Sequence, residues 1–247
     1  MSRSTYPLSM HRLAPEDLRM RELPPKPDQL PTSVDLRPKM PPVYDQGTLG
    51  SCTANALMAA IEYDDPGYMG SRLFCYFNER AAEGDTPDDA GARLCDGVAT
   101  LERFGVCPEA MWPYDISKFT VQPPAECYSA ASSHKVLQAH NVPQDMDSMK
   151  HCLSSGFPFV VGITVFSSFE SQQVAQNGVV PLPTPMDSCL GGHAVLCVGY
   201  DDARGCWIMR NSWSAGWGDQ GYFYLPYTYL LDHGLATDLW TITAVQP

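Results

Sequence analysis

The chain has 247 residues, of which 44% are hydrophobic and only 18% charged, so it is long enough for a large core and too apolar for a disordered, collagen-like or coiled-coil protein. Acidic residues outnumber basic ones by 28 to 16, and no dense run of Lys and Arg occurs, so we expect no nucleic-acid partner. No apolar run approaches the roughly 18 residues that span a bilayer, and the N-terminus lacks the apolar block of a secretory signal. We therefore expect no membrane partner and leave the location open, with the cytoplasm slightly favoured.

The first 33 residues predict an extended arm. Prolines break up any helix longer than Ala14–Glu22, and apolar residues are sparse. The arm is slightly basic, whereas residues 34–247 are strongly acidic, which favours docking of the arm on the body of the protein. A disordered tail is the alternative.

Three helices are predicted in the first half of the chain. Ser51 is a plausible N-cap for a helix over Cys52–Tyr63, which is apolar on nearly every side and should be buried. Asp64–Gly67 would end it. Apolar periodicity predicts further helices near Ser71–Ala82 and Arg93–Phe104.

After residue 155 the pattern changes to short β-type runs separated by Gly, Pro and Asp turns. These runs are Phe159–Phe166, Ala194–Tyr200, Cys206–Arg210 and Gly221–Leu225. A helical half followed by an antiparallel half indicates an α+β fold of two packed lobes, with the functional site in the cleft between them.

The chain contains nine cysteines, so any set of disulfides leaves at least one thiol unpaired. No CxxC pair and no Cys/His cluster at zinc spacing occurs, which makes a structural metal site improbable.

Cys52 is the candidate for a reactive thiol. It stands at the first turn of the predicted buried helix, where backbone N–H groups and the helix dipole stabilise a thiolate. A buried, unreactive cysteine is the commoner alternative. The small residues of Gly47–Ser51 favour a nucleophile, because they let the backbone turn sharply and bring the Gln46 amide near the reacting centre.

A thiol nucleophile needs a base, and His193 is the candidate, because it follows two glycines and opens a β-type run. Asn211, just after another run, could accept from the imidazole and fix its tautomer, with Trp213 shielding that bond. Taken singly, His193, Asn211 and Trp213 could each be an ordinary core or turn residue.

Taken together, these segments resemble the papain-like cysteine peptidases. The resemblance covers about residues 34–230 and is carried by four motifs in the family's order: Val34–Asp35–Leu36–Arg37, Gln46–Gly47 with Gly50–Ser51–Cys52, Gly192–His193–Ala194–Val195, and Asn211–Ser212–Trp213 with Gly216–Trp217–Gly218 and Gly221–Tyr222.

The resemblance implies a papain-like α+β fold with a mainly helical left lobe, an antiparallel β-barrel-like right lobe and an active-site cleft between them. It divides the chain into an arm over residues 1–33 and a peptidase domain over 34–247. Within that domain, the helical lobe spans about 45–130, and the β lobe spans 131–247 together with 34–44. No cofactor and no metal are implied.

The resemblance also assigns roles. Cys52 attacks as a thiolate paired with protonated His193, Asn211 orients His193, and the Gln46 amide with the Cys52 backbone N–H holds the oxyanion. Trp213 and Ser51 support the site. The residues implied to bind substrate by pairing with an extended peptide are Gly91 and Ala92. Leu94, Gly162 and Ala194 are expected to line a pocket for a medium-sized or bulky apolar side chain, and Gly192, before His193, to leave room for the substrate.

The sequence departs from the family in two places. Leu49 stands where members usually have a disulfide cysteine, which suits a bacterial-type branch, although Cys189 with Cys206 or Cys95 with Cys107 could pair in an oxidising compartment. The segment before Val34 resembles a prosegment but is very short. We expect it to lie through the cleft as an intramolecular inhibitor.

The resemblance predicts a cysteine endopeptidase, made in a latent form, that acts on peptide or protein substrates as a monomer. An exopeptidase of the same family is the alternative, because only the lack of a His-rich insertion argues against it. Two further alternatives are a Cys-His acyltransferase and a non-enzymatic relative that only binds peptides.

Overall fold

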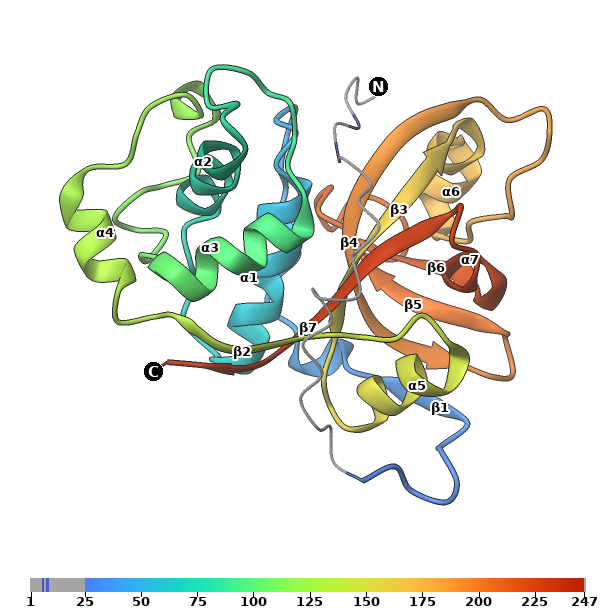
Figure 1. The fold of residues 1–247 in the computed structure, drawn as a ribbon. Helices are drawn as coiled ribbons and strands as arrows, with labels where there is room; N and C mark the ends of the chain where they lie inside the picture. The colour runs from blue at the N-terminus through green and yellow to red at the C-terminus, as the bar shows by residue number, and fades with distance from the viewer. Residues whose placement is uncertain (1–5, 7, 9–24, 247) are drawn as a thin grey trace.

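The structure is a computed structural model that describes residues 6, 8 and 25–246. The helix that we considered over Ala14–Glu22 lies outside these residues. A group of helices lies on one side of the molecule and a bent antiparallel sheet on the other, and the longest of these helices faces the sheet (Figure 1). The protein therefore has the two-lobed α+β fold that the sequence predicts.

The helical side consists of α1 (Cys52–Asp64), α2 (Arg72–Glu83), α3 (Leu94–Phe104) and α4 (Ala125–Ala131). The helices predicted from the sequence correspond to α1, α2 and α3 and differ from them by a residue at either end. Helix α2 begins at Ser71, whose hydroxyl accepts from a backbone N–H in the first turn, and ends at a left-handed glycine. The short α4 was not predicted.

Helix α1 is the central element of the fold. Every residue from Cys52 to Ile61 is buried, as its apolar sequence predicts. Ser51 occupies the N-cap position, but its hydroxyl makes no capping bond. It instead accepts from Asn55 Nδ2 at 3.0 Å and bonds to the Tyr114 hydroxyl.

The seven-stranded sheet has the order β2-β7-β3-β4-β5-β6, with β1 paired to β4, and each of these pairings is antiparallel. Its strands are β1 (Ser33–Asp35), β2 (Val136–Asn141), β3 (Phe159–Phe166), β4 (Cys189–Asp201), β5 (Cys206–Arg210), β6 (Tyr222–Pro226) and β7 (Ala236–Val245). The four predicted runs correspond to β3, β4, β5 and β6, although β4 begins five residues before the predicted Ala194.

Strands β2 and β7 were not predicted, because polar residues interrupt their apolar pattern. In the structure these residues bond between the two strands: Asn141 Nδ2 donates to the Leu239 carbonyl at 2.9 Å, and His140 bonds to Thr243 at 3.0 Å. Their partners lie about a hundred residues away, so no local pattern reveals them.

Short helices fill the connections of the sheet. They are α5 (Met146–Ser154), α6 (Gln172–Asn177) and α7 (Tyr227–Leu231), with the 3-10 turns η2 (Arg37–Lys39) and η4 (Ser167–Glu170). A third 3-10 turn, η3 (Ile116–Lys118), lies between α3 and α4. None of the described helices is both long and apolar enough to cross a membrane.

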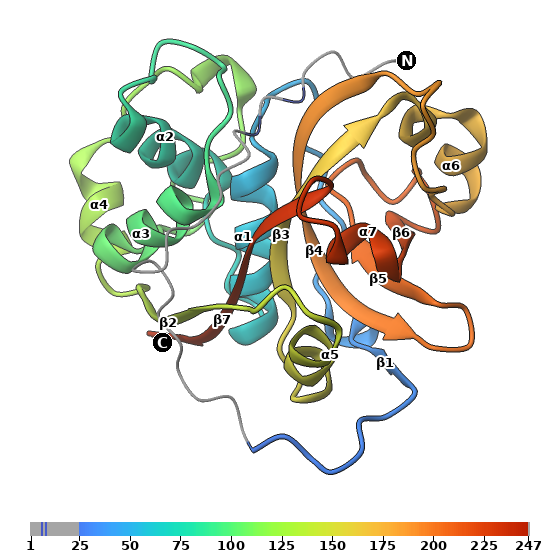
Figure 2. The same cartoon turned by 45° about the vertical axis from the view of Figure 1, so that its right-hand side comes forward.

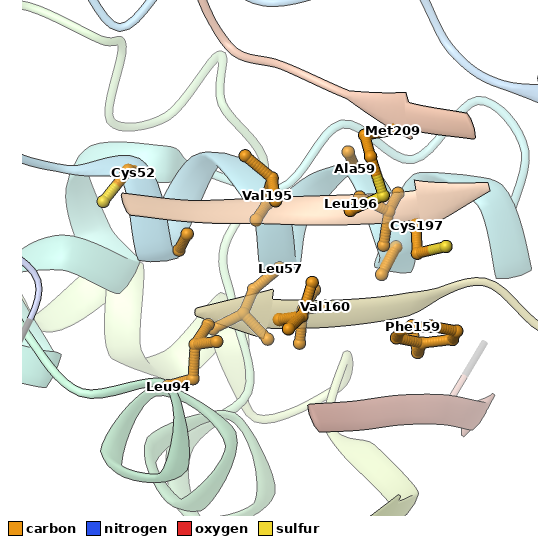
Figure 3. Packing of buried hydrophobic residues seen from close by; sticks show 14 of the residues in the cluster. Cys52, Leu57, Ala59, Leu94, Phe159, Val160, Val195, Leu196, Cys197 and Met209 are labelled. Carbon is orange, nitrogen blue, oxygen red and sulfur yellow. The ribbon is translucent and has the colours of Figure 1, made fainter. Parts of the chain in front are cut away.

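The core lies where α1 packs between the other helices and the sheet (Figure 2). Figure 3 shows Leu57 of α1 and Leu94 of α3 facing Val160 of β3, with Val195 of β4 close by. The pairing of β3 with β4 sets Gly162 opposite Ala194 and the next residue of β3 opposite His193. The core therefore fixes the position of α1 relative to the strand that carries the histidine.

Removing side-chain volume from this core should destabilise the protein. We expect Leu57→Ala, at a site with no exposed surface, to lower the free energy of unfolding by about 2–5 kcal/mol through lost burial and a residual cavity. The same change at Leu137, which is 57% exposed, should stay within about 0.5 kcal/mol. Urea unfolding of both variants checks this, and equal effects would contradict the assigned core.

Candidate active site

Cys52 is the first residue of α1 and is 2% exposed. Burial raises the pKa of its thiol to about 12, and backbone N–H groups, that of Ala194 first, oppose this by pointing at the sulfur. The sulfur therefore lies beside β4, next to the residue that follows His193. In this arrangement the thiol holds its proton, and it needs a neighbouring base to lose it.

His193 lies on β4 and is also 2% exposed. Its Nε2 lies 2.9 Å from Asn211 Oδ1, an oxygen that also accepts from the Ser212 backbone N–H. Because an amide oxygen only accepts hydrogen bonds, Nε2 must donate and therefore carries the proton. Nδ1 is then unprotonated and remains as the base. The imidazole stacks on Trp213 with ring centroids 5.0 Å apart, so the indole that we expect to shield the bond to Asn211 lies against the imidazole.

Gln46 is held in one orientation near this pair. Its backbone N–H donates to the Ser212 carbonyl at 2.9 Å, and its Oε1 accepts from the Ser212 hydroxyl at 2.5 Å. Nε2 donates to the Leu49 carbonyl at 3.0 Å. The amide nitrogen, with its two hydrogens, therefore faces the turn that leads into Cys52.

Asp89 fixes that turn from the other side. Its carboxylate accepts from the Gly50 backbone N–H at 3.0 Å and from the Tyr76 hydroxyl at 2.5 Å. The Tyr76 hydroxyl in turn accepts from the Gly91 N–H at 3.2 Å. The segment expected to bind substrate and the segment before Cys52 are thus joined through two side chains whose roles the sequence did not reveal.

The residues expected to bind substrate lie around this site, and they stay predictions. Ala92, Leu94 and Ala194 are at most 1% exposed, and Gly162 is also buried. These four residues are therefore enclosed in this structure and are not open to a substrate. Gly192 is in direct contact with the N-terminal arm.

Two described residues of the arm reach the site. The Gly192 N–H donates to the Tyr6 carbonyl at 3.2 Å, and the Leu8 N–H donates to the Gly192 carbonyl at 3.3 Å, which is the bonding pattern of parallel strands. The Tyr6 ring stands edge-on to His193, with centroids 6.1 Å apart, and Leu8 is buried. The arm therefore covers the imidazole.

Glu79 on α2 is a buried carboxyl that sequence reasoning missed. It accepts from the Thr53 hydroxyl at 2.7 Å and from the Cys75 thiol at 3.5 Å. Burial raises its pKa to about 8, although the bonds from Thr53 and Cys75 lower it. Gly97 packs so closely that a Cβ there would lie 2.5 Å from the carboxyl oxygen. A charged Glu79 would in turn raise the pKa of Cys52.

All nine cysteines lie in the described part of the chain, and none is bridged to another. The two disulfides considered for an oxidising compartment are therefore absent from this structure. No group of three or more His, Cys, Asp or Glu side chains among the described residues is placed to hold a metal ion.

Comparison with known sequences and structures gives a consistent family. The model described as papain family cysteine protease matches residues 75–238. An uncharacterized peptidase C1-like protein of Acanthamoeba polyphaga mimivirus is 41% identical over 215 residues, which cover 81% of this chain and 69% of that protein. A probable cysteine protease of Arabidopsis thaliana, RD21C, is 30% identical over 80% of this chain but only 44% of its own length.

Among solved structures, xylellain, a cysteine protease from Xylella fastidiosa, is 40% identical and superposes with a TM-score of 0.89 over 98% of this chain and 97% of that chain. A digestive procathepsin L 3 of Tenebrio molitor has a TM-score of 0.70 at 23% identity, over 91% of this chain and 73% of that chain, and shows the shared fold alone.

The raised pKa of Glu79 predicts a specific pH dependence of stability. Between pH 4.5, the ordinary pKa of a glutamate, and about pH 8, Glu79 is protonated in the folded protein but ionised in the unfolded chain. The free energy of unfolding therefore falls as the pH rises through that window. Glu79→Gln should remove this loss and, relative to wild type, gain a few kcal/mol between pH 4.5 and 8.5. Urea unfolding across the window checks this, with the exposed Glu126→Gln as control; a wild-type pH slope in Glu79→Gln would contradict it.

Proposed function

Since the chain belongs to the papain family of cysteine proteases, whose members hydrolyse peptide bonds, we propose that it is an endopeptidase with Cys52 as its nucleophile. The observation that supports the proposal is the arrangement around His193. Asn211 fixes the tautomer of the imidazole so that Nδ1 can take a proton, and the Cys52 sulfur lies at the backbone N–H of Ala194, the next residue of β4.

In the proposed reaction the Cys52 proton moves to His193, and the thiolate attacks the carbonyl carbon of the scissile bond. The pKa of the buried thiol, raised to about 12, is no obstacle, because the transfer creates a thiolate and an imidazolium together. His193 then gives the proton to the leaving amine, and water hydrolyses the thioester. The Asn211 carbonyl stabilises the imidazolium through the bond to Nε2.

The negative charge on the carbonyl oxygen needs donors that are already in place. The Gln46 amide is held by bonds to Ser212 and Leu49, so it loses no orientational freedom during the reaction. The Cys52 backbone N–H belongs to the first turn of α1, where it has no partner within the helix. We assign these two groups to the oxyanion.

A carboxylate near the site favours endopeptidase over carboxypeptidase action. Glu170 bonds to Tyr6, which lies against His193, and so marks the side of the site from which the amine leaves. A carboxypeptidase must bind the substrate's terminal carboxylate on that side, and Glu170 would repel it.

We assign the arm the role of an intramolecular inhibitor. Tyr6 and Leu8 pair with Gly192 and cover His193, so a peptide cannot reach the imidazole until the arm leaves. Hydrogen bonds and ring contacts, not a covalent link, join these two residues to the site, which suits a reversible block. We keep residues 1–33 as the arm and 34–247 as the peptidase domain, so their junction lies within β1 (Ser33–Asp35).

Activity should depend on Cys52. We expect Cys52→Ala to lower kcat/KM by at least about a thousandfold, because no other group can form the thioester. Hydrolysis of a fluorogenic dipeptide with a bulky apolar residue followed by Arg, under reductant, measures this. Cys206→Ala, a cysteine of β5, serves as the matched control and should stay within about twofold. Equal loss in both variants would contradict the role of Cys52.

Removal of the arm should raise activity. A form beginning at Pro25 keeps the contacts that hold the next segment, such as the Tyr200 hydroxyl on the Pro31 carbonyl at 2.7 Å. It loses two backbone hydrogen bonds and the ring contact at the site, so we expect kcat/KM to rise by about tenfold or more. The same fluorogenic assay checks this. Equal kcat/KM with and without residues 1–24 would contradict latency while leaving the peptidase activity intact.

A further inference from the structure

We propose that Glu170 determines specificity by binding the hydroxyl of a tyrosine side chain in the substrate, on the side of the scissile bond that leaves as the amine. This inference rests on the proposed peptidase function and deepens it, because it names a chemical feature of the substrate. The arm provides the observation behind it, since Tyr6 occupies the place that such a side chain would take.

Contacts of three kinds hold Tyr6. Its carbonyl accepts from the Gly192 N–H, and the Leu8 N–H donates to the Gly192 carbonyl, so these two arm residues pair with the start of β4. The ring lies 6.1 Å from His193 and 6.0 Å from Trp213, between centroids. The hydroxyl donates to a carboxylate oxygen of Glu170. Backbone, ring and hydroxyl are thus each recognised.

Gly191 makes room for this side chain. A Cβ on Gly191 would lie 2.4 Å from the Tyr6 carbonyl oxygen and 2.8 Å from the Tyr6 Cβ, closer than such atoms approach. The residue also has a φ of +134°, which an L side chain rarely adopts. The surface beside His193 is therefore shaped for an extended peptide that carries a large side chain here.

The Glu170 carboxylate is presented by a rigid segment. It ends the turn η4, directly after Phe169, which is 1% exposed and packs edge-on against Trp213 with centroids 5.6 Å apart. On its other side, the Ser171 hydroxyl accepts from Val174 and caps α6. The carboxylate is thus held at the edge of an aromatic surface, where the ring of a tyrosine packs and its hydroxyl reaches the oxygen.

The proposed mechanism makes this a substrate subsite as well as an arm contact. His193 protonates the leaving amine, so the residue that carries this amine must lie against the imidazole. Tyr6 now lies there. A substrate that displaces the arm meets the same Trp213 ring and the same Glu170 carboxylate through its first or second residue after the scissile bond.

A carboxylate at this place discriminates between side chains of similar shape. The hydroxyl of a substrate tyrosine donates a charge-assisted hydrogen bond to the carboxylate. A phenylalanine would shield the carboxylate from water without donating a hydrogen bond to it. Glu170 is only half-buried, so we expect a preference for tyrosine over phenylalanine of about tenfold, well below that of a fully enclosed site. A glutamate in the substrate would be disfavoured by repulsion.

The test uses the full chain and pairs of competing peptides. Internally quenched peptides share a bulky apolar residue followed by Arg before the scissile bond and carry Tyr, Phe or Glu at the first or second position after it. Mass spectrometry confirms where each is cut. The ratio of kcat/KM for two competing substrates does not depend on the fraction of enzyme whose arm is displaced, so arm binding does not disturb the readout.

We expect wild type and the control Glu126→Gln to prefer Tyr over Phe by about tenfold at one of the two positions. Glu170→Gln keeps only a weaker, neutral acceptor and should reduce this preference and accept Glu more readily. An unchanged Tyr/Phe ratio in Glu170→Gln, or no preference in wild type, would overturn the assignment of Glu170 while peptide hydrolysis upholds the peptidase. Hydrolysis of none of the peptides by wild type would overturn the proposed function and this inference together.

Discussion

Helix α1 is apolar on nearly every side, so it is stable only when it is enclosed, and β4 forms one wall of that enclosure. This burial has a chemical consequence, because α1 begins with Cys52 and β4 carries His193. The hydrophobic contact that stabilises the fold also sets the thiol beside the imidazole. A close-packed core shifts little, and the distance between the two groups therefore does not depend on a mobile loop.

The same burial sets an electrostatic problem. A charge created at Cys52 has almost no water around it, and burial raises the pKa of the thiol to about 12. Two kinds of group oppose this effect. Backbone N–H groups point at the sulfur, and Asn211 fixes the position of the proton on the neighbouring imidazole. Glu79, whose pKa burial raises to about 8, stays neutral at lower pH and adds no negative charge near the sulfur there. Under the proposed mechanism, the thiolate forms among neutral buried groups and shares its proton with His193.

Two described residues of the N-terminal arm, Tyr6 and Leu8, contact the surface beside His193. The arm's contacts at Tyr6 include backbone bonds, an aromatic contact and a hydroxyl on a carboxylate, and each of these is a contact that a substrate could also make. Under the proposed function, inhibitor and substrate therefore compete for one surface. The strength of the arm's binding and the selectivity for substrate then derive from the same residues.

Much of this protein could be predicted from the sequence. The helical half followed by the β half, the buried α1 and strands β3 and β5 follow from apolar periodicity, which is local in the chain. The motifs around Cys52, His193, Asn211 and Gln46 indicate the family, because nucleophile, base and orienting residue each have a recognisable local frame. Strands β2 and β7 did not follow, because their polar residues find partners about a hundred positions away.

Only the tertiary structure decided how distant residues meet. In it, the Asp89 carboxylate accepts from the Gly50 N–H, the Glu79 carboxyl accepts from the Thr53 hydroxyl, and the Tyr6 hydroxyl donates to Glu170. A carboxylate in a sequence resembles any solvated acidic residue, and neither its burial nor its partner is encoded nearby. The sequence by itself determined the family and the elements whose apolar pattern is local. Packing determined the remaining strands, which acidic groups are buried and what they contact, because these depend on segments that only folding brings together.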